Sequence, residues 1–152
     1  MLRISKLTDY GTVILACLAS QADRLWTAAE VAERTRVGLP TVSKLLKKLQ
    51  RTGLVISTRG SHGGYQLAGP PGEISAARIL DALEGPVAIT ECSGQHSNCG
   101  IESSCRVGHV WQRLNGAIRR ALTEMTLAQL AGLERSSSTS VPLTRLVRAS
   151  HE

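Results

Sequence analysis

The sequence predicts a mainly α fold, a winged helix-turn-helix with a two-stranded wing and a long helix towards its C-terminus. Three observations support this prediction. Short helical patterns precede a basic helical segment, a glycine-rich turn separates two β-prone runs, and one apolar stripe repeats at three- and four-residue spacing over residues 107–125. With 152 residues, the chain has room for one ordinary domain or for a small domain with an appended helix.

The first two helices are marked by residues that typically cap a helix. Thr8 or Asp9 can cap a first helix that runs to about Gln21. Thr27 and Glu30 form a capping-box pattern at the start of a second helix. The chain is therefore expected to open with two helices.

A third helix and the wing follow. Pro40 suits the first turn of a helix, because its φ is already helical and its missing N–H is not needed there. Gly53 ends that helix. Residues 54–58 and 65–68 are expected to form strands, and the turn 59–64 between them contains residues that tolerate positive φ.

Two further helices are expected after the wing. Ser75 can cap the first of them, and Gly85 and Pro86 end it. The apolar stripe predicts a second helix of about five turns, roughly 28 Å long. Its members are Val107, Val110, Trp111, Leu114, Ala117, Ile118, Ala121, Leu122 and Met125.

The net charge of +6 is confined to the N-terminal part of the chain. Residues 1–60 contain ten Lys and Arg against four Asp and Glu, whereas residues 61–152 contain eight of each. Such segregation indicates a polyanionic partner for the first part. A basic surface that serves only solubility is the alternative, but it would not need this asymmetry.

Double-stranded DNA is the partner that fits a basic winged helix-turn-helix. In this arrangement the third helix enters the major groove with its N-terminal side chains at base edges. Thr41 and Ser43 can hydrogen-bond base edges, and Val42 can meet a thymine methyl group. The side chains expected on phosphates or in the minor groove are basic: Lys44, Lys47, Lys48 and Arg51 on the helix, and Arg59 and His62 at the wing tip. The alternative is a merely solvated basic face.

The apolar stripe is too long to be covered by a core of roughly seventy residues. A second copy of the chain is the simplest partner, giving a two-fold homodimer that presents two wings to a near-palindromic operator. Packing back on the first helix of the same chain is the alternative, and both are expected on different parts of the stripe.

Three cysteines, Cys92, Cys99 and Cys105, lie within fourteen residues of polar, glycine-containing sequence that offers a thiol no burial. Soft thiolates suit an iron–sulfur cluster, zinc or copper(I), and composition alone leaves the metal open. His109, four residues after Cys105, is a candidate for a fourth ligand, and His96, Glu91 and Asp9 are others. No organised Cys-His-acid constellation is evident from the spacing, so we expect neither an enzyme nor a small-molecule substrate.

A cytoplasmic, reducing location is expected, in which these thiols act as ligands rather than in disulfides. Basic residues followed by the apolar run 13–19 resemble a short export signal, but Asp9 interrupts the basic region and the run is only seven residues long. No run approaches the ~20 apolar residues of a membrane span, so no membrane partner is expected.

Four stretches resemble the IscR/NsrR family of bacterial winged-helix regulators. They are residues 3–11 (RISKLTDYG), the helix 45–49 (LLKKL), the wing 59–68 (RGSHGGYQLA) and the three cysteines. The resemblance covers about residues 1–131 and looks most like the branch that regulates the SUF iron–sulfur assembly operon. It implies a homodimer, a [2Fe–2S] or [4Fe–4S] cluster held by the three cysteines and one non-cysteine ligand, and repression or activation of cluster-assembly genes.

This sequence departs from the family pattern around the cysteines. Members with three cysteines commonly have five residues in each gap, but six separate Cys92 from Cys99. The cluster-assembly regulators place a histidine three residues after the third cysteine, where this chain has Gly108, and His109 follows one later. In nitric-oxide-sensing members the fourth ligand resembles Asp9 and reaches across from the other subunit.

These observations divide the chain into four expected segments. Residues 1–86 form the DNA-binding domain, 87–106 a cysteine-rich cofactor loop, 107–132 a dimerisation helix and 133–152 a disordered tail. The leading hypothesis is a transcription factor that senses cluster status. The alternative is a cofactor-free or zinc-stabilised winged-helix repressor that responds to thiol oxidation or nitric oxide.

Overall fold

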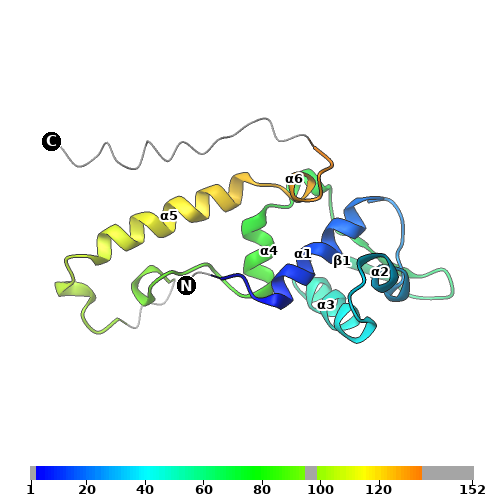
Figure 1. Cartoon of the computed structure of the whole chain (residues 1–152), viewed down its shortest axis with the longest axis horizontal. Coiled ribbons are helices and arrows are strands. Elements are labelled where there is room, and N and C mark those ends of the chain that lie inside the picture. Colours follow the sequence, from blue (N-terminus) through cyan, green and yellow to red (C-terminus); the bar gives the residue numbers. More distant parts are fainter. Residues whose placement is uncertain (1–2, 95–98, 135–152) are drawn as a thin grey trace.

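The computed structural model describes residues 3–94 and 99–134, and the predicted tail 133–152 lies almost wholly outside them. The predicted mainly helical winged helix-turn-helix is confirmed (Figure 1). Within the described residues, no helix is both long and apolar enough to traverse a bilayer. The helices are α1 (Lys6–Ala19), α2 (Ala28–Thr35), α3 (Leu39–Arg51), α4 (Ala76–Leu83), α5 (Gly108–Glu124) and α6 (Leu127–Leu130). The strands are β1 (Val55–Thr58) and β2 (Gly64–Leu67), and the short 3-10 turns are η1 (Pro71–Glu73), η2 (Glu91–Ser93) and η3 (Glu102–Ser104).

Helix α1 begins earlier than predicted, because Ser5 rather than Thr8 or Asp9 caps it. The Ser5 hydroxyl accepts a hydrogen bond from the Thr8 backbone N–H at 3.2 Å. Thr8 is only 1% exposed, so its side chain lies inside the fold instead of at the helix end. The helix also ends two residues before the predicted Gln21, where the Ser20 N–H donates to the Ala16 carbonyl.

The capping box of α2 is confirmed. The Thr27 side chain accepts from the Glu30 N–H, and the Glu30 carboxylate accepts from the Thr27 N–H at 2.8 Å. The Thr27 hydroxyl also donates to the Glu30 carboxylate at 2.9 Å, and the hydrogen bonds from the Thr27 N–H and from this hydroxyl lower the pKa of Glu30. Pro40 lies in the first turn of α3, as its fixed φ predicts.

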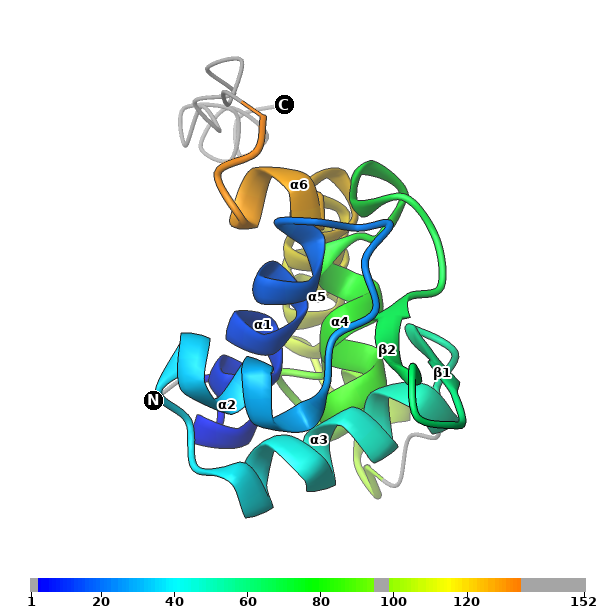
Figure 2. The ribbon, with the colours of Figure 1, turned by 90° about the vertical axis from the view of Figure 1, so that its right-hand side faces the viewer.

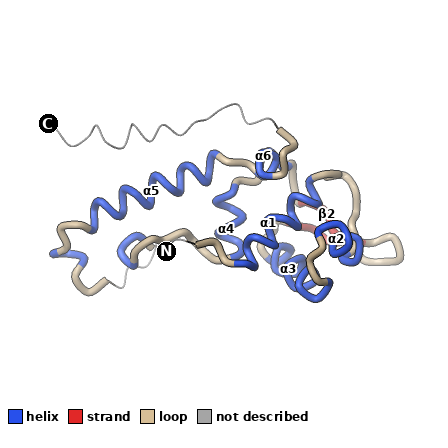
Figure 3. Tube along the Cα trace, viewed as in Figure 1, coloured by secondary structure: helices blue, strands red, loops and turns tan. Residues whose placement is uncertain are grey.

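The wing is a β-hairpin, and the backbone of Trp26 hydrogen-bonds to it. β1 and β2 pair antiparallel, with Val55 opposite Leu67. Trp26, just before α2, exchanges two hydrogen bonds of 2.8 Å with Tyr65 of β2. A Cβ at Gly64 would lie 2.8 Å from the Trp26 carbonyl oxygen, so only glycine allows this approach. The position of the wing is thus tied to the start of α2 (Figure 3).

The aliphatic core lies between α1, α3, α4 and the wing, and α6 closes it (Figure 2). Leu127 of α6 is fully buried in this core. Two short backbone hydrogen bonds hold α6 at the core. Ala76 N–H donates to the Met125 carbonyl (2.8 Å), and Leu127 N–H donates to the Ile74 carbonyl (2.7 Å). The core therefore includes residues from both sides of the cysteine segment.

Helix α5 extends away from this core as an arm and carries the cysteine segment at its far end (Figure 1). Arg119 on α5 makes two hydrogen bonds to the Asp81 carboxylate on α4, of 2.9 and 2.6 Å. Much of the apolar stripe remains exposed, including Val110 (63%) and Trp111 (41%).

Candidate nucleic-acid interface and cysteine centre

The outward face of α3 is basic. Lys44, Lys47 and Arg51 are all exposed, and their three- and four-residue spacing places them on one side of the helix. Thr41 and Ser43, near the N-terminal end of α3, are half-buried. The helix therefore presents hydroxyl groups at its start and cations along its length.

Val42 does not belong to this surface, and its predicted contact with a thymine methyl group is wrong. Its side chain is 0% exposed and lies in the core with Leu45, Leu46 and Leu49. The three- and four-residue spacing of these positions fixes Val42 on the buried side of α3.

Lys48 makes a contact within the protein that the sequence did not predict. Its Nζ donates a 2.7 Å hydrogen bond to the carbonyl oxygen of Leu83, the last residue of α4. Lys48 follows Lys47 in sequence, and a one-residue step turns a helix by about 100°. In this structure Lys48 therefore makes a contact between helices, and a phosphate contact at Lys48 stays a prediction.

The structure brings α3 and the wing together around a groove of about 530 Å³, which we call the α3–wing groove. Lys47 and Arg59, predicted separately, both line it. The Gln50 side-chain amide donates to the Ser57 hydroxyl at 2.7 Å and so joins α3 to β1. His62 is exposed in the wing turn but does not line the groove.

Sequence analysis missed the role of Gln50. It lies three residues after Lys47, and this spacing was the available indication that the two share a flank of α3. Thr27, predicted only as a helix cap, lines the same groove.

Two of the three cysteine sulfurs converge on Gly108 at the start of α5. A Cβ at this position would lie 3.6 Å from the Cys105 Sγ and 4.0 Å from the Cys92 Sγ. A methyl group at this position would make ordinary van der Waals contact with both sulfurs, so the two thiols lie beside the start of α5. The four cysteines, all within the described residues, form no disulfide.

The described residues do not gather these thiols into a closed metal centre. Across 3–94 and 99–134, no group of three or more His, Cys, Asp and Glu side chains is arranged to hold a metal ion. Cys99 is half-buried and directly follows residues 95–98, which lie outside the described part of the chain. Of the three predicted cysteine ligands, Cys92 and Cys105 are the two whose sulfurs lie beside Gly108.

Polar side chains of α5 hold the first part of the cysteine segment. Gln112 donates to the Cys92 carbonyl at 3.0 Å. Asn115, 8% exposed, accepts from the Ile89 N–H at 3.2 Å and donates to the Ser93 carbonyl at 3.4 Å. The Thr90 hydroxyl lies 3.2 Å from the Cys92 sulfur. Sequence analysis missed both α5 residues, although a polar Asn115 beside the apolar stripe was an indication.

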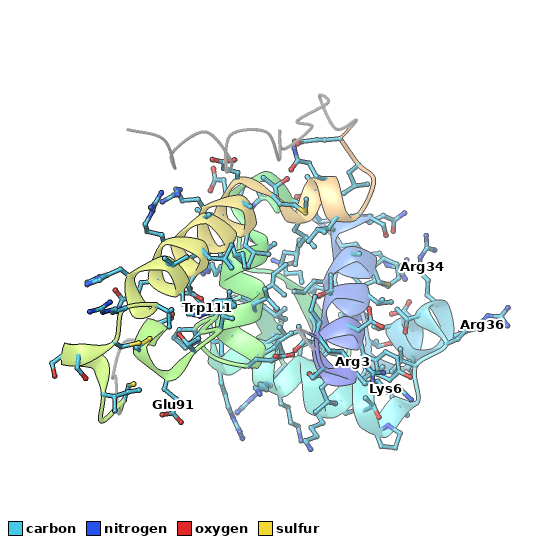
Figure 4. All side chains as sticks on the ribbon, turned by 60° about the vertical axis from the view of Figure 1, so that its left-hand side comes forward. Arg3, Lys6, Arg34, Arg36, Glu91 and Trp111 are labelled. Atoms are coloured by element: carbon cyan, nitrogen blue, oxygen red, sulfur yellow. The ribbon has the colours of Figure 1, made fainter. Side chains whose placement is uncertain are left out.

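Glu91 is exposed in η2, directly before Cys92, and His96 lies outside the described residues. The other two candidates for a fourth ligand, His109 and Asp9, lie at different ends of α5. His109 is exposed in its first turn, next to Gly108. Asp9 lies in α1 and lines a groove with Leu122 and Met125, near the last turn of α5. The 17 residues of α5 span about 24 Å. A single chain therefore brings His109, but not its own Asp9, to the cysteine end, which Glu91 and Trp111 mark in Figure 4.

Cys17 is 8% exposed and lies within the core. Burial raises the pKa of the Cys17 thiol, which keeps the group protonated. It is therefore a structural cysteine.

Comparison with known proteins identifies relatives among bacterial regulators. The Rrf2 family, described as iron-dependent transcriptional regulators, matches residues 4–132. A putative HTH-type transcriptional regulator of Haemophilus influenzae is 37% identical over 102 residues, which cover 67% of each chain.

Two solved structures are similar along most of the chain. CymR, described as the global cysteine regulator of B. subtilis, has a TM-score of 0.69 at 28% identity and is matched over 89% of this chain and 100% of its own. IscR of T. potens has a TM-score of 0.64 at 30% identity, over 88% of this chain and 89% of its own. The protein is a DNA-binding transcriptional regulator and not an enzyme, and it belongs to the Rrf2 family.

Proposed function

We propose that this protein senses iron–sulfur cluster status in the cytoplasm and controls iron–sulfur assembly genes of the SUF or ISC type. Cys92, Cys99 and Cys105 are the proposed cluster ligands. The observation that carries the proposal is the convergence of the Cys92 and Cys105 sulfurs over Gly108. The similarity to IscR of T. potens supports the same assignment.

The cysteine end suits an iron–sulfur group in donor type. Thiolates are the usual ligands of such clusters, and the sulfurs of Cys92 and Cys105 lie on the same side of Gly108. A bound cluster would supply an iron centre whose presence depends on iron supply and oxidants. The Thr90 hydroxyl beside the Cys92 sulfur can stabilise the thiolate by a hydrogen bond.

His109 is the proposed fourth ligand from the same chain, because it adjoins Gly108 in the first turn of α5. Asp9 can take this role only from a second subunit, since α5 separates it from the cysteines of its own chain.

A homodimer formed through α5 is part of the proposal. Val107, Val110, Trp111 and Met125 on and beside this helix are 41–63% exposed. Ile4, 58% exposed, lies beside the same apolar groove near the last turn of α5. Apolar surface of this extent is typical of an interface rather than of a monomer. Two copies would present two α3 helices and two wings to a near-palindromic operator.

A thiol-responsive regulator without a cluster, or with structural zinc, is the second candidate. The similarity to CymR, described as a cysteine regulator, favours it.

Cys99→Ala distinguishes these candidates. After anaerobic reconstitution, we expect wild-type protein to contain iron and sulfide and to absorb visible light, and we expect Cys99→Ala to lose both because one thiolate is missing. Cys17→Ala is the matched control and should retain them, since Cys17 lies in the core. Stoichiometric zinc, or a colourless wild type after reconstitution, would instead support the second candidate.

His109→Ala tests the fourth ligand. With the three thiolates intact, we expect most of the iron to remain and the visible absorption bands to shift, because one ligand atom is exchanged. Asp9→Ala should leave the spectrum unchanged. The opposite pattern, a shift for Asp9→Ala alone, would assign the ligand to a second subunit.

Val110→Glu tests the dimer. A carboxylate at this exposed α5 position would have to be buried between the copies, so we expect the dimer Kd to rise at least a hundredfold in sedimentation equilibrium. Ile56→Glu is the control, because Ile56 is 45% exposed on β1, away from α5. Dissociation by both variants, or by neither, would contradict the proposed interface.

Lys47→Ala and Ser43→Ala separate phosphate contacts from base contacts. Lys47→Ala should weaken binding to operator and random DNA by the same factor and reduce the salt slope by about one. Ser43→Ala should cost about 1 kcal/mol on the operator and little on random DNA. The measurement is a salt titration of DNA affinity, and equal losses for Ser43→Ala on both duplexes would refute its assignment.

A further inference from the structure

The bond between Lys48 and α4 connects the DNA-facing helix to the element that leads into the cysteine segment. Leu83 is the last residue of α4, and its carbonyl accepts from the Lys48 Nζ at 2.7 Å. The chain leaves α4 through Gly85, with φ at +95°, towards the cysteine segment. The two elements meet at this point although Lys48 and Leu83 are 35 positions apart in sequence.

The same end of α4 is also fixed to α1. Glu84 accepts a 2.9 Å hydrogen bond from the Ser5 N–H, at the cap of α1. Hydrogen bonds from Thr8 and Ser5, and the charge of Lys48, lower the pKa of Glu84 and keep its carboxylate ionised. The Leu83 side chain packs so closely on α1 that a Cβ at Gly11 would lie 2.5 Å from its Cδ1.

Helix α4 also contacts α5. Asp81 binds the Arg119 guanidinium of α5 through two hydrogen bonds. Asn115, one helical turn before Arg119, holds the Ile89 and Ser93 backbone in the cysteine segment. Three separate groups of polar contacts, joined by the helices α5 and α4, thus link the cysteine segment to α3.

We infer that Lys48 is a positioning residue that couples the state of the cysteine segment to the orientation of α3. This inference rests on the proposed function. A shift of residues 85–94 would move the Leu83 carbonyl, and Lys48 would transmit that movement to the face of α3 that carries Lys47. Coupling of this kind requires that the contact exist in one state and be altered in the other.

Lys48→Met tests the inference, because it removes the donor and keeps the apolar part of the side chain. DNA affinity is measured for cluster-loaded and cluster-free protein, on a duplex selected from random sequence by the wild type. We expect the two wild-type states to differ at least tenfold and the two Lys48→Met states to differ less than threefold. Iron content, visible spectrum and dimer Kd should equal those of the wild type.

Lys47→Met is the matched control. It should weaken both states by one common factor and preserve the tenfold difference. A tenfold difference that persists in Lys48→Met would overturn the inference and leave the proposed function intact. Equal affinities of the two wild-type states would overturn both.

Hydrogen exchange of the wild type gives a second measurement that needs no folded variant. Cluster loading should change exchange at the amides of Glu84 and Gly85 together with that of Thr52, whose N–H donates to the Lys48 carbonyl. A change confined to the end of α4, with α3 unaffected, would also overturn the inference.

Discussion

The close packing of α4 on α1 positions both the DNA-facing helix α3 and the cysteine segment. Gly11 has no Cβ, so the Leu83 side chain can press against the α1 backbone. The end of α4 lies beside α3, where Lys48 donates to the carbonyl of Leu83. It also sets the direction in which the chain leaves the core towards the cysteines. The contact between Leu83 of α4 and Gly11 of α1 therefore helps to orient α3 and the arm formed by α5 relative to each other.

The two ends differ in how they are stabilised. The helix-turn-helix end is held by fully buried aliphatic side chains such as Leu46, Leu49 and Leu54. The cysteine end depends on a few polar contacts to α5, chiefly those of Gln112 and Asn115. Segments with few buried apolar contacts open at low free-energy cost. Such a segment can change its conformation when its thiols change state, while the DNA-binding end stays folded.

Local sequence patterns were sufficient for the elements and insufficient for their contacts. Thr27 with Glu30, Pro40 and the wing glycines act within a few residues, so the helices and the hairpin could be predicted. Val42 was misassigned because a β-branched residue near a helix start suits either a base contact or a core. The pairing of Trp26 with Tyr65 joins residues far apart in sequence, and no local pattern encodes it. The position of Gly108 beside two sulfurs depends equally on how α5 returns past the segment that contains Cys92.

The different uses of Lys47 and Lys48 show why charge alone overestimates a nucleic-acid interface. Both are exposed lysines on a basic helix, and composition cannot separate them. The rotation of about 100° between these adjacent residues directs Lys47 to the α3–wing groove and Lys48 to the end of α4. A carbonyl at a helix C-terminus carries partial negative charge and is a favourable partner for an ammonium group. That partner is part of the protein, so the charge of Lys48 contributes to the arrangement of its helices, whereas the charge of Lys47 remains available to a phosphate.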